Sequence, residues 1–350
     1  MSSGPRIAID AMGGDQGPAA VIAGACRALR RRDDLTFQFF GDEALIAPEL
    51  ARFPELAAVS RVEHCADMIK GDEKPSQAMR RSKTTSMGRA IAAVKAKEAD
   101  AVVSGGNTGA LMAMAKLALR MLPGIDRPAL AGLMPTLGEN DVVMLDLGAN
   151  TESDANNLIQ FALMGAAYAR VVLELEAPRV RLLNIGSEEQ KGTDELKDAA
   201  AVLKEAATAL GLRFDGYIEG HQMSRGDVDV IVSDGFSGNI ALKTMEGTAR
   251  YIGDLIRRAF ANSIRSKIGF AISRPATQLL KHHLDPNNHN GGVFLGLNGL
   301  VVKSHGGANE VGLANAIHVA QRMARHDLTR RITDDLAQVS ASALGSVAAQ

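Results

Sequence analysis

Small polar side chains and glycines gather in one short stretch, Ser104-Gly105-Gly106-Asn107-Thr108-Gly109, between two apolar segments. The preceding residues 101–103 have the apolar, partly β-branched character of a buried strand, and residues 111–119 repeat apolar side chains at helical spacing. Glycines let a backbone approach a ligand closely, and the free N–H groups at a helix start attract an anion. The stretch therefore predicts either a phosphate or carboxylate site, or a tight turn that binds nothing.

The same succession of strand, glycine turn and helix recurs along the chain. The other four turns contain Asp10, Gly13 and Gly14; Asp146 and Asn150; Asn184 and Gly186; and Asp234, Ser237, Gly238 and Asn239. Strands alternating with helices predict a three-layer αβα fold with a mainly parallel sheet covered on both faces. Because ligands bind beyond the carboxyl ends of such strands, we expect all five turns to share one edge of the sheet.

Composition narrows the class of protein. The chain has 350 residues, is 46% hydrophobic and carries a formal net charge of −1 at pH 7, so it has no basic excess for nucleic acid. No linker divides it, and we expect one two-lobed α/β catalytic domain over residues 1–340 with a flexible tail over 341–350. The start lacks a secretory signal and no apolar run could span a membrane, which favours a cytoplasmic location.

Several common chemistries lack their motifs. The turns at 13–17 and 105–109 read G-G-x-x-G rather than G-x-G-x-x-G, and neither a P-loop nor a G-x-S-x-G elbow occurs, so no nucleotide cofactor is expected. Cys26 and Cys65 fit no zinc spacing. His282, His283 and His289 with Asp285 lie in an irregular loop without an acidic cluster, so we expect no metal there.

With those chemistries set aside, the small polar side chains at the glycine turns are suited to binding a small oxyanion. Cations that could assist them are Lys191, Lys243, Lys303 and His305. The acids at strand ends, Asp10, Asp146 and Asp234, have two open interpretations: each could brace its own turn or take part in catalysis.

Six blocks carry a resemblance to a known family: "IAIDAMGGDQGP", "ADAVVSGGNTGALMA", "LDLGANTES", "LLNIGSEEQKG", "VSDGFSGNIALKTMEG" and "VVKSHGGAN". In this order and spacing, from about Arg6 to Leu336, the chain resembles the PlsX family of phosphate acyltransferases. The stretch "YIEGHQMSRGDVDV" departs from the commonest family wording. The resemblance implies a fold similar to phosphotransacetylases and isocitrate-type dehydrogenases, and a homodimer. It also implies transfer of a fatty acyl group from acyl carrier protein to inorganic phosphate, giving an acyl phosphate for phospholipid synthesis by a downstream membrane acyltransferase.

That reaction fits the turns. Phosphate is already a nucleophile and a thiolate is a good leaving group, so the site needs only to hold phosphate beside the thioester carbonyl and to stabilise developing charge. We expect Lys243 or His305 to stabilise that charge, with Asp234 orienting Lys243. The predicted phosphate-binding set is Asp10, Gly13, Gly14, Ser104, Gly105, Gly106, Asn107, Thr108, Asn150, Asn184, Gly186, Ser237, Gly238 and Asn239.

Other functions stay open. A phosphotransacetylase-like enzyme would take acyl-CoA in place of acyl carrier protein, and a membrane-docked scaffold would have no activity. A dehydrogenase is disfavoured because the ribose-binding pattern is missing.

Residues 251–283 differ from the rest of the chain. Apolar residues, among them Phe260, Ile264 and Ile268, recur at helical spacing, whereas Arg265 and Lys267 fall between them. Such a face packs on the core or across a dimer, or it contacts anionic lipid or the acidic carrier protein. Contact with anionic lipid would make this a peripheral protein on the inner face of the membrane.

Overall fold

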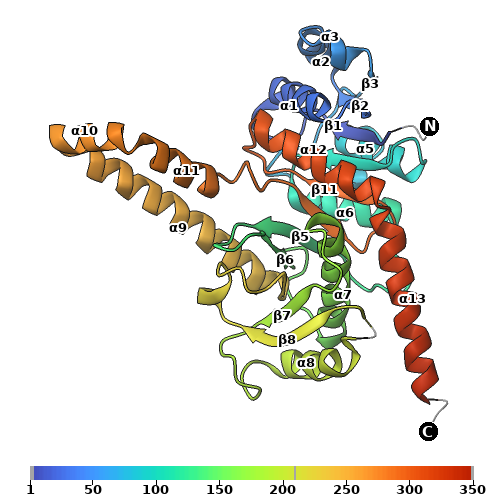
Figure 1. The fold of residues 1–350 in the computed structure, drawn as a ribbon. Helices are drawn as coiled ribbons and strands as arrows, with labels where there is room; N and C mark the ends of the chain where they lie inside the picture. The colour runs from blue at the N-terminus through green and yellow to red at the C-terminus, as the bar shows by residue number, and fades with distance from the viewer. Residues whose placement is uncertain (1–3, 209, 348–350) are drawn as a thin grey trace.

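The computed structural model describes residues 4–208 and 210–347, within which eleven strands form one sheet (Figure 1). Their order across the sheet is β3-β2-β1-β4-β11-β10-β5-β6-β9-β7-β8. The strands are β1 (Arg6–Asp10), β2 (Thr36–Gly41), β3 (Ser60–His64), β4 (Ala101–Ser104), β5 (Ala129–Met134), β6 (Val142–Leu145), β7 (Arg179–Leu183), β8 (Arg213–Ile218), β9 (Val230–Val232), β10 (Gly292–Leu295) and β11 (Leu300–Lys303).

Helices cover both faces of the sheet. They are α1 (Gly17–Arg31), α2 (Glu43–Leu50), α3 (Pro54–Ala57), α4 (Pro75–Arg80), α5 (Ser86–Lys95), α6 (Thr108–Leu119), α7 (Ala155–Val172), α8 (Asp194–Ala206), α9 (Gly235–Ala261), α10 (Ile264–Ile272), α11 (Arg274–Leu284), α12 (Glu310–Arg325), α13 (Leu328–Val347) and the 3₁₀ helix η1 (Gly220–Gln222). The predicted αβα architecture is confirmed.

The direction of the strands changes in the middle of the sheet. β5 pairs antiparallel with both β10 and β6, whereas β1, β4 and β11 are parallel to one another, as are β6, β9, β7 and β8. The carboxyl ends of β1 and β4 therefore lie at the opposite end of the sheet from those of β6, β7 and β9. The expectation that all five glycine turns share one edge is wrong.

Alternating side chains of the strands build a core on each face. Ile7 and Ile9 of β1 point to the face covered by α1, α7 and α12, and Ala8 points to the face covered by α5 and α6. On that second face, Leu242 and Met245 of α9 pack over the other half of the sheet. Both halves thus have the two-sided burial that their apolar strands predict.

The helix α9 runs from one end of the sheet to the other. It starts after β9, packs on β6, and reaches far enough for the Lys243 charge to act on Lys303 at the end of β11. Beyond the sheet it continues with α10 and α11 as an arm that projects from the body (Figure 1). We call residues 251–284 the arm. No helix among the residues described is long and apolar enough to cross a membrane.

The arm leaves apolar side chains in the open. Ile264 is 78% exposed, Ile268 57% and Ile272 77%, while Phe260 and Phe270 contact each other with ring centroids 5.1 Å apart. Packing on the core of the same chain is thereby excluded for this face, and a second copy, lipid or a partner remain as its possible contacts.

The last helix extends into the segment predicted as a tail. α13 packs against α7 and continues as helix through Val347, so it includes residues 341–347 of the expected tail. Residues 348–350 lie outside the described part of the chain.

Candidate functional site

A cavity of about 680 Å³ opens where the turns after β1, β4 and β11 meet. We call it the cradle. Its walls are Met12, Gly14, Asp15, Met68, Ile69, Lys70, Gly71, Gly105, Gly106, Asn107, Thr108, Gly109, Lys303 and Gly306. Five of the predicted phosphate-binding residues line it: Gly14, Gly105, Gly106, Asn107 and Thr108.

The start of α6 gives one wall of the cradle its donors. Asn107 caps the helix, its side-chain oxygen accepting from the N–H of Ala110 at 2.9 Å. The N–H groups of Thr108 and Gly109 precede the first helical hydrogen bond, so they are free to bind a ligand. The Thr108 side chain is exposed and borders the same space. This wall can hold an anion by two N–H groups and a hydroxyl.

The floor of the cradle is a buried hydrogen-bonded layer. Asp10 is 2% exposed and accepts from the hydroxyls of Ser86 and Ser104, each at 2.7 Å. Burial raises the pKa of Asp10, although these bonds oppose the shift. Gly13 lies against it, and a Cβ there would be 2.6 Å from the Asp10 carboxylate. Asp10, Gly13 and Ser104 therefore shape the turns from beneath and do not face the cavity.

Lys303 brings a positive charge to the cradle. Its ammonium donates to the carbonyl of Gly105 at 3.3 Å and to that of Ser304. Burial lowers its pKa to about 8, against the opposing effect of Asp10 and Asp15. The ammonium is thus still charged near neutral pH and lies directly beside the predicted anion turn.

His305 and Lys243 approach the rim from two elements. His305 is exposed, and its Nδ1 accepts from the N–H of Gly307 at 3.1 Å. Partial desolvation lowers the pKa of His305, and the charges of Glu246 and Lys243 on α9 act on it. The imidazole is therefore neutral at pH 7 and keeps Nε2 available as a donor.

A second cavity of about 1130 Å³ lies at the other end of the sheet. Asn184, Asp234 and Ser237 line it. Asn184 holds its own loop, donating to the carbonyl of Lys191 at 3.1 Å, and Gly186 lies in that loop against Lys191. These residues are separate from the cradle because β7 and β9 end at the opposite edge.

The turn after β6 is locked by its own hydrogen bonds. Asp146 is fully buried and accepts from Asn150 through both its N–H and its Nδ2, each at 2.8 Å. Asn239 donates to the carbonyl of Leu147 at 3.0 Å, and Gly238 packs on the carbonyl of Asp146. For Asp146, Asn150, Gly238 and Asn239 the structure supports the interpretation as turn braces.

The predicted pairing of Asp234 with Lys243 is wrong. Asp234 caps α9 by accepting from the N–H of Ser237 at 2.9 Å, and the Lys243 ammonium pairs with Glu246 at 3.0 Å. Nine residues of helix place the two side chains about 13 Å apart along the axis. Asp234 thus lies at the second cavity and Lys243 near the cradle.

The histidine-rich segment shows no metal-binding arrangement, and His282 and His283 lie in the last turn of α11 rather than in the irregular loop expected from the sequence. His289 pairs with Asp141 at 2.9 Å, and Asp285 accepts from the backbone and side chain of Asn287. Within the described residues, no group of three or more His, Cys, Asp or Glu is placed to hold a metal ion.

One wall of the cradle was missed by the sequence interpretation. Residues 68–71, between β3 and α4, line it and bring in Lys70. The glycine and charges of "IKGDEKP" mark a loop, but nothing in them indicates which site the loop reaches.

Comparisons with known proteins show the family to which the chain belongs. A family model described as "Fatty acid synthesis protein" matches residues 5–331. A phosphate acyltransferase of Erythrobacter litoralis is 64% identical over 335 residues, covering 96% of this chain and 94% of the relative. One from Beijerinckia indica is 53% identical, covering 95% and 86%. The chain belongs to the phosphate acyltransferase family. The resemblance to the PlsX family is confirmed.

Solved structures of other proteins have a fold similar to that of this chain. A phosphotransacetylase from Streptococcus pyogenes superimposes with a TM-score of 0.61 at 17% identity, covering 93% of this chain and 95% of that one. The EutD phosphotransacetylase from Staphylococcus aureus gives 0.57, also at 17% identity, covering 92% and 94%. The α/β fold shared with phosphotransacetylases is thereby confirmed.

Proposed function

We propose that this phosphate acyltransferase family member moves a fatty acyl group from the thioester of acyl carrier protein to inorganic phosphate. A phosphate oxygen attacks the thioester carbonyl carbon, the C–S bond breaks, and the thiolate leaves with its electron pair. The thiolate takes up the proton that the hydrogen phosphate dianion gives up, so the products are an acyl phosphate and the free thiol of the carrier protein. The family supports acyl transfer to phosphate; the carrier protein as donor is part of the proposal.

The single observation that carries the proposal is the wall at the start of α6. There, Thr108 and Gly109, whose N–H groups precede the first helical hydrogen bond, line the same cavity as Lys303. Such donors bind phosphate oxygens and offset their charge. Gly14 and Gly105 let the turns of the cradle pack closely, because a Cβ on either would lie 3.1 Å from a backbone carbonyl of a neighbouring turn.

Direct attack needs no thiol nucleophile of the enzyme, and neither cysteine is suited to be one. Cys26 is buried, and desolvation together with a hydrogen bond to Glu55 raises its thiol pKa to about 11. Burial also raises the pKa of Cys65. Both thiols are protonated at neutral pH and poorly nucleophilic.

The groups at the rim are the proposed charge stabilisers. His305 offers a neutral imidazole N–H, and Lys243 an ammonium, to the carbonyl oxygen or to the departing sulfur. Both act on charge that develops only in the transition state, which is where such donors accelerate a reaction. Neither forms a covalent bond in this scheme.

The test is to trap the product with hydroxylamine while acyl carrier protein thioester and phosphate are varied independently. We expect hydroxamate to form only when both are present, and acyl-CoA to compete poorly. Preference for acyl-CoA would support the phosphotransacetylase-like alternative. Thioester loss that does not depend on phosphate, or no turnover, would contradict the proposed function.

The arm is the proposed contact with other molecules. Its exposed Ile264 and Ile268 flank the cations Arg265 and Lys267, a pattern typical of helices that rest on anionic lipid. Docking there would place a cytoplasmic enzyme where a membrane acyltransferase consumes the labile acyl phosphate. A homodimer would instead cover the same apolar side chains with a second copy of the arm.

A further inference from the structure

The segment between β3 and α4 forms a separate wall of the cradle, and its position rests on a few side chains. We call residues 67–73 the wall loop. Met68, Ile69, Lys70 and Gly71 from this loop line the cavity opposite the turns after β1 and β11. The inference below rests on the proposed function, in which the cradle holds phosphate.

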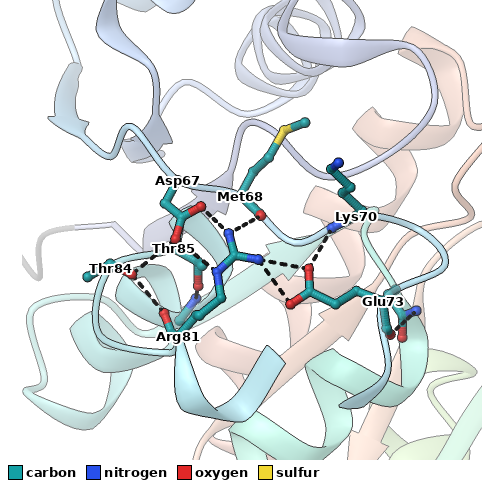
Figure 2. Close-up of polar contacts among 9 residues, drawn as sticks. Asp67, Met68, Lys70, Glu73, Arg81, Thr84 and Thr85 are labelled. Atoms are coloured by element: carbon teal, nitrogen blue, oxygen red, sulfur yellow. Dashed lines mark hydrogen bonds and ion pairs between the residues drawn. The ribbon is translucent and has the colours of Figure 1, made fainter. Parts of the chain in front are cut away.

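Arg81, just after α4, holds the two ends of the wall loop at once (Figure 2). At one end its guanidinium contacts both carboxylate oxygens of Asp67 and the carbonyl of Met68. At the other end its Nη1 donates to both oxygens of Glu73 at 3.0 Å. A planar guanidinium with several fixed donors is suited to such a clamp, and a lysine is not.

The clamp continues into the floor and the anion wall of the cradle. The Asp67 carbonyl accepts from the N–H of Ser86, the same serine whose hydroxyl donates to Asp10. The Asn107 side chain donates to the carbonyl of Gly71 at 2.7 Å and to that of Glu73 at 3.3 Å. The wall loop is therefore fastened to the α6 cap beside the free N–H groups of Thr108 and Gly109.

Isolated surface ion pairs contribute little, but this cluster is a network. Only 10% of the Glu73 side chain is exposed, and its carboxylate also accepts from the N–H of Lys70. Shared, bidentate contacts fix a loop geometry better than single exposed pairs do. The backbone of Lys70 is thus held by the same carboxylate that Arg81 holds.

The Lys70 side chain takes no part in this network. Its ammonium has no hydrogen-bond or ion-pair partner among the described residues, and it points away from the Arg81 clamp (Figure 2). The residue is exposed and borders the cavity that also contains Lys303. A cation without a partner at the edge of an anion site is available to the ligand.

We propose that Lys70 binds the phosphate in the cradle and that Arg81 is the positioning residue that presents it. The phosphate then lies between two ammonium groups, Lys303 from β11 and Lys70 from the wall loop, with the α6 donors on a third side. Arg81 itself does not touch the ligand.

The first test is Lys70→Met, which keeps the stem and removes the charge. We expect the KM for phosphate to rise roughly tenfold and the KM for the thioester to stay unchanged, because one charge-assisted contact to phosphate is lost. Lys70→Arg should restore most of the phosphate affinity. The matched control is Lys83→Met, an exposed lysine just after α4 that does not line the cradle.

A double-mutant cycle separates positioning from general stability. Arg81→Met should raise the KM for phosphate in the wild-type background but add little in the Lys70→Met background, because its effect passes through Lys70. Near-UV circular dichroism and the Tm check that the variants fold. If Arg81→Met does not fold, Arg81→Lys, which loses the fork but keeps a charge, takes its place in the cycle.

Each outcome decides a different claim. Unchanged phosphate KM in Lys70→Met, in an enzyme that still needs phosphate, overturns the role of Lys70. Equal effects of the Arg81 variant in both backgrounds overturn its role in positioning. Wild-type turnover that ignores phosphate overturns the proposed function itself.

Discussion

Thr108 lines the cradle at the first position of α6, where its backbone N–H has no intrahelical partner, so it is the residue at which the phosphate site can be tested most simply. Thr108→Ala removes the hydroxyl and keeps the helix start. Loss of one hydrogen bond to a charged ligand costs about 1.5–3 kcal/mol, so the phosphate dissociation constant should rise by roughly one to two powers of ten. Isothermal titration with phosphate measures it.

The matched control for that change is Thr151→Ala, since Thr151 is an exposed threonine that lines the second cavity. Its phosphate affinity should equal that of the wild type. If Thr151→Ala weakens phosphate binding and Thr108→Ala does not, the anion site lies at the other end of the sheet.

Lys303 should give phosphate binding a pH dependence. Its pKa, lowered to about 8 by burial, means that the ammonium loses its proton as the pH rises through 8. Inorganic phosphate is already the dianion there, so its own ionisation does not mask the effect. We expect the KM for phosphate to rise above pH 8 in the wild type and to stay flat in Lys303→Arg. A wild-type KM that is flat through this range would contradict the role of Lys303.

The same residue affects stability with a defined sign. Because the folded-state pKa lies below the ordinary value of 10.5, the unfolded chain binds more protons between about pH 8 and that value. The free energy of unfolding should therefore increase through Lys303 as the pH rises from about 8. Bound phosphate favours the charged ammonium in the folded protein, so it should make this increase smaller.

Among individual residues, the sequence predicted those that belong to a recognisable motif. Gly105, Gly106 and Thr108 were found because a glycine turn before a helix has a recognisable pattern, and all three line the cradle. Lys70 was missed because the loop that carries it is held by Arg81, 11 residues away in the chain, and by Asn107, which lies further still. Such contacts leave no local pattern.

Among the elements, the turn after β6 is a brace whose removal should affect stability. Asp146 accepts hydrogen bonds from four backbone N–H groups, those of residues 130, 148, 149 and 150. An amide in its place cannot accept at the nitrogen position. Asp146→Asn should therefore lower the free energy of unfolding by about 1–3 kcal/mol in urea titrations, with phosphate affinity unchanged.

The control for the brace is Asp215→Asn on the exposed face of β8, which should change stability by less than about 0.5 kcal/mol. Equal stability of the Asp146 and Asp215 variants, together with lost phosphate binding in the former, would assign Asp146 to the ligand instead.

The arm is the second element with a direct test. Each Lys or Arg near an anionic surface contributes about 1 kcal/mol, so Arg257, Arg258, Arg265 and Lys267 should give weak, salt-sensitive binding to anionic vesicles. Ile264→Asp with Ile268→Asp should abolish co-sedimentation. Ile185→Asp, at an isoleucine of the body that is 82% exposed, should not.

A wild type that does not sediment, or arm variants that sediment equally well, would contradict membrane contact. If those variants instead dissociate a dimer in analytical ultracentrifugation, a second copy of the chain covers the arm.

Strand and helix positions were predictable, but strand direction was not. The strand ending at Asp10 and the helix starting near Pro18 match β1 and α1. The antiparallel strands β5 and β10 reverse the second half of the sheet, and their short apolar sequences carry no signal of direction. The five similar turns therefore divide between two ends of the sheet, which local patterns could not reveal.

For the whole molecule, α9 joins what the strand reversal separates. It begins at the second cavity and runs along the sheet until the charge of Lys243 acts on Lys303 of the cradle. The blocks quoted for the family resemblance come from both halves of the chain. Their order in the sequence indicated a common function, whereas their division between the two ends of the sheet required the structure.

The central claim is that phosphate held in the cradle attacks the thioester directly. The most direct measurement is a single-turnover experiment in which enzyme and acyl carrier protein thioester are mixed first and phosphate is added later. The account predicts no thiol release and no acyl adduct on the protein by mass spectrometry until phosphate is added, followed by equal amounts of thiol and acyl phosphate. A stoichiometric burst of thiol with an acylated protein before phosphate is added would contradict it.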